Sequence, residues 1–436
     1  MRIAVIGSGI SGNACAFALS ATHDVILYEK RDRTGGHSAT VDIDYDGTRM
    51  AVDTGFIVYN ELNYPNLVAL FRHLEVETEA SDMSFGVSID NGRLEWAGTS
   101  LGTIFAQKRN LASPQFLWML REIVRFNRCC AADLENGRMA GLSLGAYLQR
   151  ARFGRAFIRD YLVPMGAAIW STPDAELLDF PAASFARFFI NHRLINLDRP
   201  IWRTVRGGSR TYVSKLLAPL LAAGRVRLGD PVVSVARTAD HVEVRTASGE
   251  VDRFDQVVFA AHTDQTLAML AEPTAEERAL LSDVRYLPNQ VYLHRDLALM
   301  PRRRAVWSSW NYLRSEGRDA KGPVAVSYWM NKLQNLDPTK PVFVTLNPDV
   351  PPDDRLVFGR FEYDHPQFDA AAIAAQRRLP ALQGDNRTWF CGAWTGYGFH
   401  EDGLSSGLAV AEALGGVVPW RAAKPETVPA LLEAAE

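Results

Sequence analysis

The feature that most constrains the fold is a glycine-rich turn near the start of the chain. Arg2–Ile6 is a short apolar run, typical of a buried parallel strand. Gly7, Gly9 and Gly12 then form the pattern G-x-G-x-x-G, and a helix is predicted to begin near Ile10. In this pattern the glycines permit a sharp turn, a close approach to a pyrophosphate and tight packing of the helix on the strand. The pattern predicts a βαβ unit of a Rossmann-type α/β fold.

The next strand ends at an acidic residue that suits a nucleotide ribose. Val25 to Tyr28 is the predicted strand, and Glu29 follows it, 22 residues after Gly7. The predicted helix N-terminus at Ile10 and Ser11 offers unpaired N–H groups to phosphates. An acid at this position disfavours NADP, because it would repel the 2′-phosphate. Nucleotide binding is therefore predicted, and the alternative is a βαβ turn that binds nothing.

Two segments after Glu29 resemble the flavin-containing amine oxidase superfamily, which includes phytoene desaturases and protoporphyrinogen oxidases. Arg33-x-Gly35-Gly36 matches a segment that lies beneath the phosphates in that superfamily, and Asp53-x-Gly55 matches a loop near the isoalloxazine ring. The resemblance implies that the nucleotide is FAD. Relatives usually carry arginine where this chain has His37.

The resemblance continues near the C-terminus. A strand, Thr388 to Cys391, leads into Gly392, and a helix is predicted to begin near Gly403. In relatives this helix N-terminus points at the flavin N1 and C2 carbonyl, where the helix dipole stabilises the reduced form. Ala393 stands where relatives usually have an acidic residue. The cofactor-binding residues implied are Gly7, Gly9, Ile10, Ser11, Gly12, Glu29, Lys30, Arg33, Gly35, Gly36, His37, Asp53, Thr54, Gly55, Phe56, Val233 (adenine), Gly392, Ala393, Gly403, Leu404 and Ser405.

The resemblance also implies a discontinuous architecture. Residues 1–75, 205–285 and 385–436 would form the FAD-binding domain. Residues 76–204 and 286–384 would form an α+β substrate-binding domain with a helical insertion. The tail after Trp420 is expected to be a loosely held helix. The four cysteines form no CxxC pair and no metal-ligand spacing, so neither a metal nor a redox-active disulfide is expected.

Aromatic residues are the candidates for a substrate pocket. Trp394, Tyr397 and Phe399 precede the predicted flavin-facing helix, while Trp310 and Trp329 lie in segments predicted to be strands. The alternative for each ring is a place in the hydrophobic core.

His400 and Glu401 are the polar side chains nearest that helix, and we expect one of them to be the catalytic base. The alternative for each is a helix cap or a surface ion. Amine oxidases of the superfamily usually place a lysine over flavin N5. The corresponding stretch here has Asn289, Gln290 and His294, and Lys332 lies on a later segment. This difference argues against amine oxidation.

Residues 113–130 predict an amphipathic helix with Phe116, Leu120, Ile123 and Val124 on its buried face. Arg121, Arg125 and Arg128, and further along Arg152, Arg155 and Arg159, are interleaved with aromatic residues. The basic face is either simply solvated or docks on anionic lipid.

The formal net charge of −3 gives no global electrostatic case for binding nucleic acid. No apolar run approaches the roughly 20 residues of a membrane span. We expect a cytoplasmic protein, either free or at the inner face of the membrane.

Several longer segments, such as "DTGFIVYN" and "GFHEDGL", resemble a bacterial subgroup described as predicted NAD/FAD-binding amine oxidase-like proteins. Its genes often lie beside those of fatty-acid-modifying methyltransferases. The resemblance implies an FAD-dependent oxidoreductase that desaturates an unsaturated or methyl-branched fatty acyl chain by hydride transfer to flavin N5. Two alternatives are an oxidase of amines or other small molecules, and a non-catalytic FAD-bound lipid-binding partner subunit.

Overall fold

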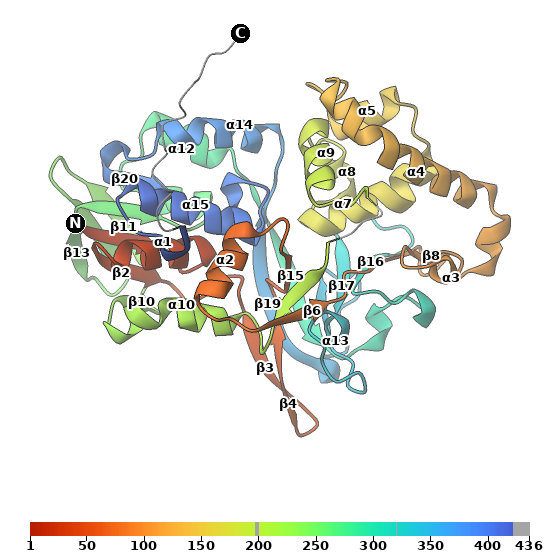
Figure 1. The fold of residues 1–436 in the computed structure, drawn as a ribbon, viewed down its shortest axis with the longest axis horizontal. Helices are drawn as coiled ribbons and strands as arrows, with labels where there is room; N and C mark the ends of the chain where they lie inside the picture. Colours follow the sequence, from red (N-terminus) through yellow and green to blue (C-terminus); the bar gives the residue numbers. More distant parts are fainter. Residues whose placement is uncertain (197–199, 320, 422–436) are drawn as a thin grey trace, which may run out of the picture.

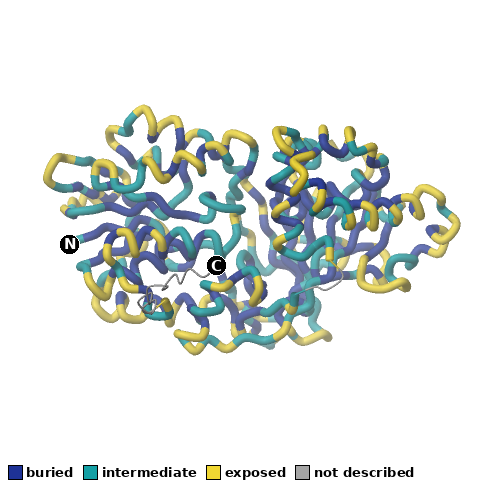
Figure 2. Tube along the Cα trace, turned by 45° about the horizontal axis from the view of Figure 1, so that its top comes forward, coloured by how far each residue is buried: buried dark blue, intermediate teal, exposed yellow. Residues whose placement is uncertain are grey.

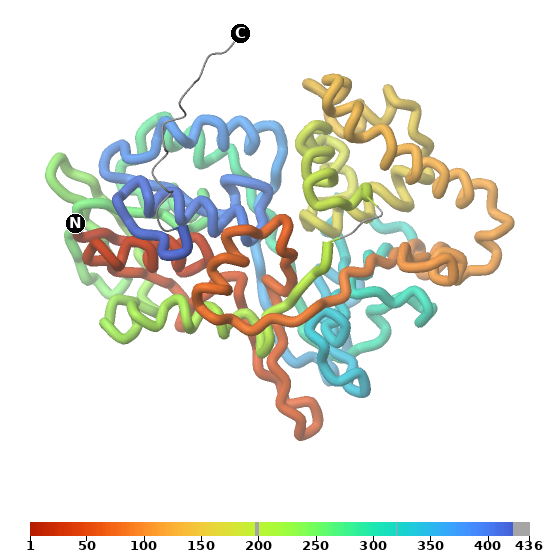
Figure 3. The backbone as a smooth tube through the Cα atoms, viewed as in Figure 1, coloured from red at the N-terminus to blue at the C-terminus, as the bar shows by residue number. Residues whose placement is uncertain are grey.

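One end of the molecule is built around a parallel sheet whose strands come from three distant parts of the chain (Figures 1 and 3). The computed structural model describes residues 1–196, 200–319 and 321–421, and the helix expected after Trp420 falls in 422–436, outside them. The strand order is β10-β2-β1-β14-β20, with all neighbours parallel. The predicted α/β fold class is confirmed. The strands are β1 (Arg2–Ile6), β2 (Asp24–Glu29), β10 (Val226–Leu228), β14 (Gln256–Phe259) and β20 (Thr388–Phe390).

Alternating side chains of β1 face two separate hydrophobic clusters. Ile3 and Val5 pack with residues of α1 (Ile10–Ser20), α10 (Arg210–Ala222) and α15 (His400–Ala413). Ala4 and Ile6 point to the other face, as strand geometry requires. There they meet an antiparallel sheet and two helices: β11 (Val232–Arg237), β12 (Val242–Thr246), β13 (Val251–Phe254), α12 (Ala275–Ser282) and α14 (Ala370–Arg378).

A seven-stranded sheet forms the middle of the molecule and is antiparallel except where β16 pairs with β7. Its order is β19-β15-β18-β17-β16-β7-β8. The segment expected to continue as a strand after Trp329 instead turns into α13 (Met330–Leu333). The strands are β7 (Phe85–Ile89), β8 (Leu94–Ala97), β15 (Tyr286–His294), β16 (Trp310–Arg314), β17 (Ala325–Trp329), β18 (Phe343–Leu346) and β19 (Val357–Pro366).

Helices cover the far part of this sheet and share one core with it. The longest, α4, buries Phe116, Met119 and Phe126, whereas Val124, predicted to be buried, is 49% exposed. Among the described residues, no helix is long and apolar enough to cross a bilayer. The helices are α3 (Leu101–Ile104), α4 (Pro114–Glu135), α5 (Leu144–Arg150), α6 (Arg155–Phe157), α7 (Val163–Trp170), α8 (Asp174–Leu177) and α9 (Ala182–Asn191).

Small sheets connect the two regions. The strands β5 (Val58–Asn60) and β6 (Thr78–Ser81) both pair with β9 (Trp202–Val205), and β3 (Thr40–Tyr45) forms a hairpin with β4 (Thr48–Asp53). The sheet of β5, β6 and β9 therefore combines residues from both sides of the expected boundaries at 75/76 and 204/205. The division of the chain into domains stays a prediction.

Candidate active site

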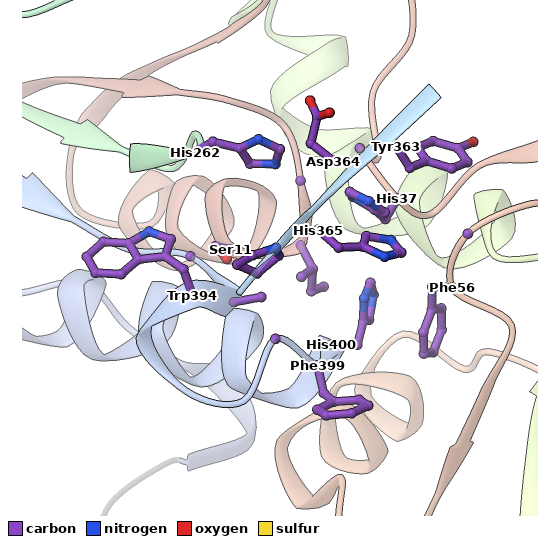
Figure 4. A pocket seen from close by; sticks show the side chains of 18 of the residues that line it. Ser11, His37, Phe56, His262, Tyr363, Asp364, His365, Trp394, Phe399 and His400 are labelled. Carbon is purple, nitrogen blue, oxygen red and sulfur yellow. The ribbon is translucent and has the colours of Figure 1, made fainter. Parts of the chain in front are cut away.

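A cavity of about 640 Å³ lies where the carboxyl ends of the parallel strands meet the seven-stranded sheet. Its wall combines the turns after β1, β2, β14 and β20 with residues of β19 and of the helical region. Ligands of open α/β sheets bind at this edge of the strands. Figure 4 shows several of the side chains that surround it, among them four histidines.

The glycine-rich turn brings α1 close to the cavity. A Cβ atom on Gly12 would lie 1.8 Å from the Gly7 carbonyl oxygen, so only glycine allows this packing. Gly9 is the N-cap of α1, which has neither a side-chain cap nor an acidic residue in its first turn. These unshielded N–H groups suit a phosphate.

Glu29 closes the same end of the cavity. Its carboxylate accepts hydrogen bonds from the backbone N and Oγ of Ser8, at 3.0 and 2.6 Å, and from the backbone N of Arg31 at 3.0 Å. Glu29 ends β2 and lines the cavity, as the ribose-binding prediction requires.

Two loops lie side by side on the cavity wall, the first with residues 36–37 and the second with residues 54–56. The backbone N of Phe56 donates to the His37 carbonyl oxygen at 2.8 Å, and that of Thr54 donates to Ala39 at 2.9 Å. Arg33 does not reach the cavity, because its guanidinium donates to the Gly36 carbonyl oxygen at 3.1 Å. It therefore holds the first loop in shape.

Asp53 supports the second loop from inside the protein. It is fully buried and accepts hydrogen bonds from Thr40 Oγ1 (2.6 Å), Ser209 N (2.9 Å) and Gln334 Nε2 (2.9 Å). Burial raises its pKa to about 6. Next to it, Thr54 Oγ1 lies 2.8 Å from the Tyr363 hydroxyl, on β19. The loop is thus fixed by both the helix α10 start and the seven-stranded sheet.

His400 lines the cavity at the first position of α15. Its ring stacks on Phe56 with centroids 3.8 Å apart, and its Nε2 lies 2.6 Å from the Tyr212 hydroxyl. The Tyr212 oxygen also lies 2.5 Å from Ser38 Oγ. Ser38, Tyr212 and His400 therefore form a chain of short polar contacts, in which either partner of each pair can be the donor. Burial lowers the pKa of His400 to about 3.

Glu401, the other residue predicted as a candidate base, does not line the cavity. Its carboxylate accepts hydrogen bonds from the backbone N atoms of Asn66 (2.9 Å) and Leu67 (3.0 Å), at the start of α2 (Pro65–His73). Successive residues of a helix point about 100° apart, so His400 and Glu401 face different surroundings.

The helix α15 begins three residues earlier than predicted. Asp402 Oδ2 accepts hydrogen bonds from the backbone N atoms of Tyr397 (3.0 Å) and Phe399 (2.9 Å), and this fixes the turn before His400. Burial raises the pKa of Asp402 to about 6. The predicted flavin contacts Gly403, Leu404 and Ser405 consequently lie beyond the first turn and do not line the cavity.

Other predicted residues also lie outside the cavity wall. Val233 is exposed, whereas its neighbour Val232 lines the cavity, because adjacent strand residues point to opposite sides. Trp329 Nε1 donates to Asn331 Oδ1 at 3.1 Å, and Tyr397 lies beside Phe188. Gly12, Arg33, Gly35 and Asp53 support the wall without lining it. The predicted residues that line it are Gly7, Gly9, Ile10, Ser11, Glu29, Lys30, Gly36, His37, Thr54, Gly55, Phe56, Gly392, Ala393, Trp310, Trp394, Phe399 and His400.

His192 is a cavity residue that sequence reasoning missed. Its Nδ1 lies 3.1 Å from the Phe188 carbonyl oxygen, which can only accept, so Nδ1 carries the proton and Nε2 carries the lone pair. Burial lowers the pKa of His192 to about 4, so the ring is neutral at neutral pH. The Phe188 ring stacks on His192 at 3.9 Å and on Phe399 at 4.9 Å. A histidine directly after an aromatic-rich helix was the only sequence signal.

Three further histidines surround the cofactor end: His37, His262 and His365. His37 and His365 lie with centroids 5.6 Å apart (Figure 4). Burial lowers the pKa of all three, to about 4 for His365. Of the lining residues, only Lys30 and Arg31 carry a fixed positive charge, and both follow β2. The histidines are therefore polar but uncharged at neutral pH, and the lining also contains the carboxylates Glu29, Glu362 and Asp364.

None of the residues considered as a substitute for the flavin-facing lysine lines the cavity. Asn289 donates to the carbonyl oxygens of Leu287 and Tyr363, and His294 Nε2 lies 2.7 Å from Thr345 Oγ1. Lys332 lies 3.8 Å from Asp82. The sequence-based argument against amine oxidation is consistent with this arrangement.

The cavity fits FAD in three respects. The Cβ position of Gly9 has no atom within 4 Å, so the turn is open to a diphosphate. Glu29 lies at the end of β2, the position from which an acidic residue binds a nucleotide ribose. At the wall, Trp394 Nε1 and His37 Nε2 are buried without a hydrogen-bond partner, and a heteroaromatic ligand with carbonyl groups would supply one. Bound FAD would be held by the α1 N-terminus, Glu29 and the loops at 36–37 and 54–56.

Comparison of the fold with solved structures gives close similarity over nearly the whole chain. A fatty acid isomerase from P. acnes that produces CLA has a TM-score of 0.66 at 14% identity, with 95% of this chain and 98% of that chain covered. Cyclohexylamine oxidase from Brevibacterium oxydans has a TM-score of 0.64 at 15% identity, with 95% and 99% covered. At such identities the likeness concerns the fold alone.

Sequence comparison identifies the family. The 15-cis-phytoene desaturase of Synechococcus elongatus is 38% identical over 78 residues, a match that spans 18% of this chain and 16% of the desaturase. Residues 10–356 match the family described as "Flavin containing amine oxidoreductase". The chain belongs to the flavin-containing amine oxidoreductases and is an FAD-dependent oxidoreductase.

Proposed function

We propose that the protein dehydrogenates a fatty acyl chain, an unsaturated or methyl-branched one carried by a lipid. The observation that carries this proposal is the lining of the cavity away from α1. That part of the lining is apolar and aromatic and contains no lysine or arginine among the described residues; the carboxylates Glu362 and Asp364 belong to the part of the lining formed by β19. The apolar part is formed by Ile57, Val58, Met83, Ile169, Phe188, Leu194, Trp202, Trp310, Tyr328, Leu346 and Phe399, with Ser171 and His192.

Two of the similar proteins support an apolar substrate by their names, a fatty acid isomerase and a phytoene desaturase. An amine substrate is less well supported, because its ammonium group would be desolvated in this part of the cavity without a charged partner.

The residues would share the work as follows. Bound FAD would supply the two-electron oxidant, with N5 as the acceptor of a hydride equivalent from one carbon of the acyl chain. The aromatic walls, including Phe188 and Phe399, exclude water and hold the neighbouring carbons in reach. His192 Nε2, which carries a lone pair at neutral pH, accepts the proton that leaves the adjacent carbon. Two C–H bonds break and one C=C bond forms. His400, whose Nε2 lies 2.6 Å from the Tyr212 hydroxyl, serves to fix the cavity wall rather than as the base predicted from the sequence.

The test is anaerobic mixing of the FAD-loaded protein with phospholipids that carry monounsaturated or methyl-branched acyl chains. We expect loss of flavin absorbance and acyl products lighter by two hydrogens in mass spectrometry. His192→Gln should slow the bleaching about 10²- to 10⁴-fold, the usual contribution of a general base. His241→Gln, a change in a surface hairpin, should leave the rate unchanged.

Two results would contradict the proposal. Bleaching by amines but not by any lipid would indicate an amine oxidase. Absence of bleaching by either, in a protein whose flavin dithionite reduces, would favour the partner-subunit alternative for this site.

A further inference from the structure

The helical region carries a surface charge opposite to that of the whole chain. Between Trp96 and Arg159 there are ten lysine and arginine residues and only three acidic residues, whereas the whole chain has a net charge of −3. All ten basic residues are exposed. They are Lys108, Arg109, Arg121, Arg125, Arg128, Arg138, Arg150, Arg152, Arg155 and Arg159.

Two of the three acidic residues are turned inward. Glu122 is buried, and its carboxylate accepts a hydrogen bond from the backbone N of Gly154 at 2.9 Å. Asp133 is buried as well, and accepts one from the Tyr147 hydroxyl at 2.8 Å. Glu135 is therefore the single exposed acid of this stretch. The exposed surface of this stretch is therefore more basic than its amino-acid composition alone indicates.

Large apolar side chains are exposed among these charges on α4. Leu117, Trp118 and Val124 are 43%, 52% and 49% exposed. The residues 117, 121, 124 and 128 follow each other at the spacing of one helix face, so Leu117 and Val124 alternate there with Arg121 and Arg128. The Arg121 guanidinium lies 4.6 Å from the centre of the Trp118 ring. Among the described residues, neither Arg121 nor Arg128 has a carboxylate within ion-pair distance.

The segment before α4 has the same character. Leu101 in α3 is 75% exposed, and Leu111, next to Lys108 and Arg109, is 57% exposed. Figure 1 places α3 and the start of α4 at the end of the molecule opposite β13, and Figure 2 shows this end as exposed chain. We call the exposed apolar and basic residues of α3, of the segment after it and of α4 the α3–α4 face: Leu101, Lys108, Arg109, Leu111, Leu117, Trp118, Arg121, Val124 and Arg128.

We propose that the α3–α4 face docks on the surface of an anionic lipid bilayer. Exposed leucine and tryptophan side chains next to arginine, on a helix whose single exposed acid is its last residue, Glu135, combine insertion among acyl chains with attraction to anionic headgroups. A nucleic acid would use the arginines but would leave Leu101, Leu117 and Val124 exposed to water. The inference stands on this surface alone and does not depend on which substrate the cavity takes.

The experiment is co-sedimentation of the FAD-loaded protein with vesicles of neutral phosphatidylcholine, and of the same lipid with 30% phosphatidylglycerol (about a physiological anionic fraction). We expect binding to the anionic vesicles that weakens as salt is raised. Removing the two charges in Arg121→Gln/Arg128→Gln should weaken it about tenfold or more, since each basic residue near an anionic surface contributes about fivefold. Trp118→Ser should weaken binding even at low salt.

A matched control lies at the other end of the molecule. Val251 is 43% exposed and Arg253 is an exposed neighbour on β13, so Val251→Ser/Arg253→Gln removes similar groups from a different surface. This variant should bind vesicles as the wild type does. An unchanged flavin spectrum and melting temperature verify that each variant is folded.

Equal binding to neutral and anionic vesicles, or equal loss in the β13 variant, would overturn the proposal. So would a 20-base-pair DNA duplex, about two helical turns, that competes with the vesicles and binds Trp118→Ser as tightly as the wild type.

Discussion

His400 and Glu401 are neighbours in the chain, yet α15 sends their side chains to different places. His400 stacks on Phe56 in the cavity wall, and Glu401 binds the backbone at the start of α2. Sequence proximity to the predicted flavin site could not separate them, because the position of the first helical turn decides which residue faces the ligand. That position depends on the Asp402 cap.

Glu401→Gln tests this separation. The amide keeps the shape but has one acceptor oxygen, so one N–H group of Asn66 or Leu67 loses its partner. We expect the free energy of unfolding to fall by about 1–2 kcal/mol, while the rate of anaerobic flavin reduction stays at the wild-type value. Denaturant unfolding and stopped-flow absorbance measure the two quantities. A large loss of rate with unchanged stability would restore Glu401 as a candidate base.

At the scale of elements, the packing of α15 on α1 positions the cofactor end of the cavity. A Cβ atom on Gly407 would lie 2.1 Å from the Ser11 carbonyl oxygen, and one on Gly403 would lie 2.9 Å from Ile10 Cγ2. The glycines of the motif around Gly403 therefore indicate close contact between α15 and α1 as well as ligand binding. The resemblance assigned Gly403 to the flavin because sequence alone does not distinguish these two uses of a glycine.

Gly407→Ala should force the two helices apart. We expect a loss of about 1–3 kcal/mol in unfolding free energy, the usual cost of overpacking, and weaker retention of FAD because Ser11 moves with α1. Thermal unfolding and the flavin-to-protein absorbance ratio after gel filtration measure both. Gly102→Ala is the matched control, since its Cβ would meet only Ser100 Oγ at 3.6 Å. If both variants behaved alike, close contact would not be the role of Gly407.

Strand prediction succeeded where pattern and motif agreed. The apolar run at Arg2–Ile6 forms a buried parallel strand as predicted. The pairing of β9 with β5 and β6 was not foreseen, because Trp202–Val205 carries no local sign of its partners. The buried stripe of α4 was misassigned at Val124, since the large apolar residues of that helix occupy both of its faces.

At the scale of the whole molecule, buried histidines link stability to pH. Burial lowers the pKa of His192, His294 and His365 to about 4, and that of His400 to about 3. Their pKa values in the unfolded chain are near 6.5, so the unfolded state takes up protons first as the pH falls. The stabilising contribution of each histidine is complete above about pH 6.5 and is lost progressively toward pH 4.

His294 isolates this effect, because it is fully buried and lies away from the cavity. In His294→Gln the amide can still bond Thr345. Between pH 6 and pH 5 we expect the unfolding free energy to fall less steeply in this variant than in the wild type. The difference between the two slopes should be about 1.4 kcal/mol per pH unit. Urea unfolding at both pH values measures the slope. Parallel slopes for variant and wild type would show that His294 is protonated in the folded protein.

The resemblance of the motifs predicted the three-segment parallel sheet and the cofactor, because nucleotide binding constrains glycines and an acid at fixed positions. Of the far wall of the cavity, only Trp310 and Phe399 were among the predicted residues, whereas the apolar side chains that α7, α9, β17 and β18 contribute there were not predicted. Such a wall needs only hydrophobic residues of suitable size, so its sequence resembles that of any core.

Gln334 and Tyr363 belong to the sheet region that shapes this far wall, and both hold the segment of Asp53 and Thr54 beneath the cofactor end. A fluctuation that releases this segment must break hydrogen bonds to both. Order at the cofactor end of the cavity is therefore thermodynamically linked to order at the far wall. Loss of the nucleotide would lower the rigidity of the far wall as well.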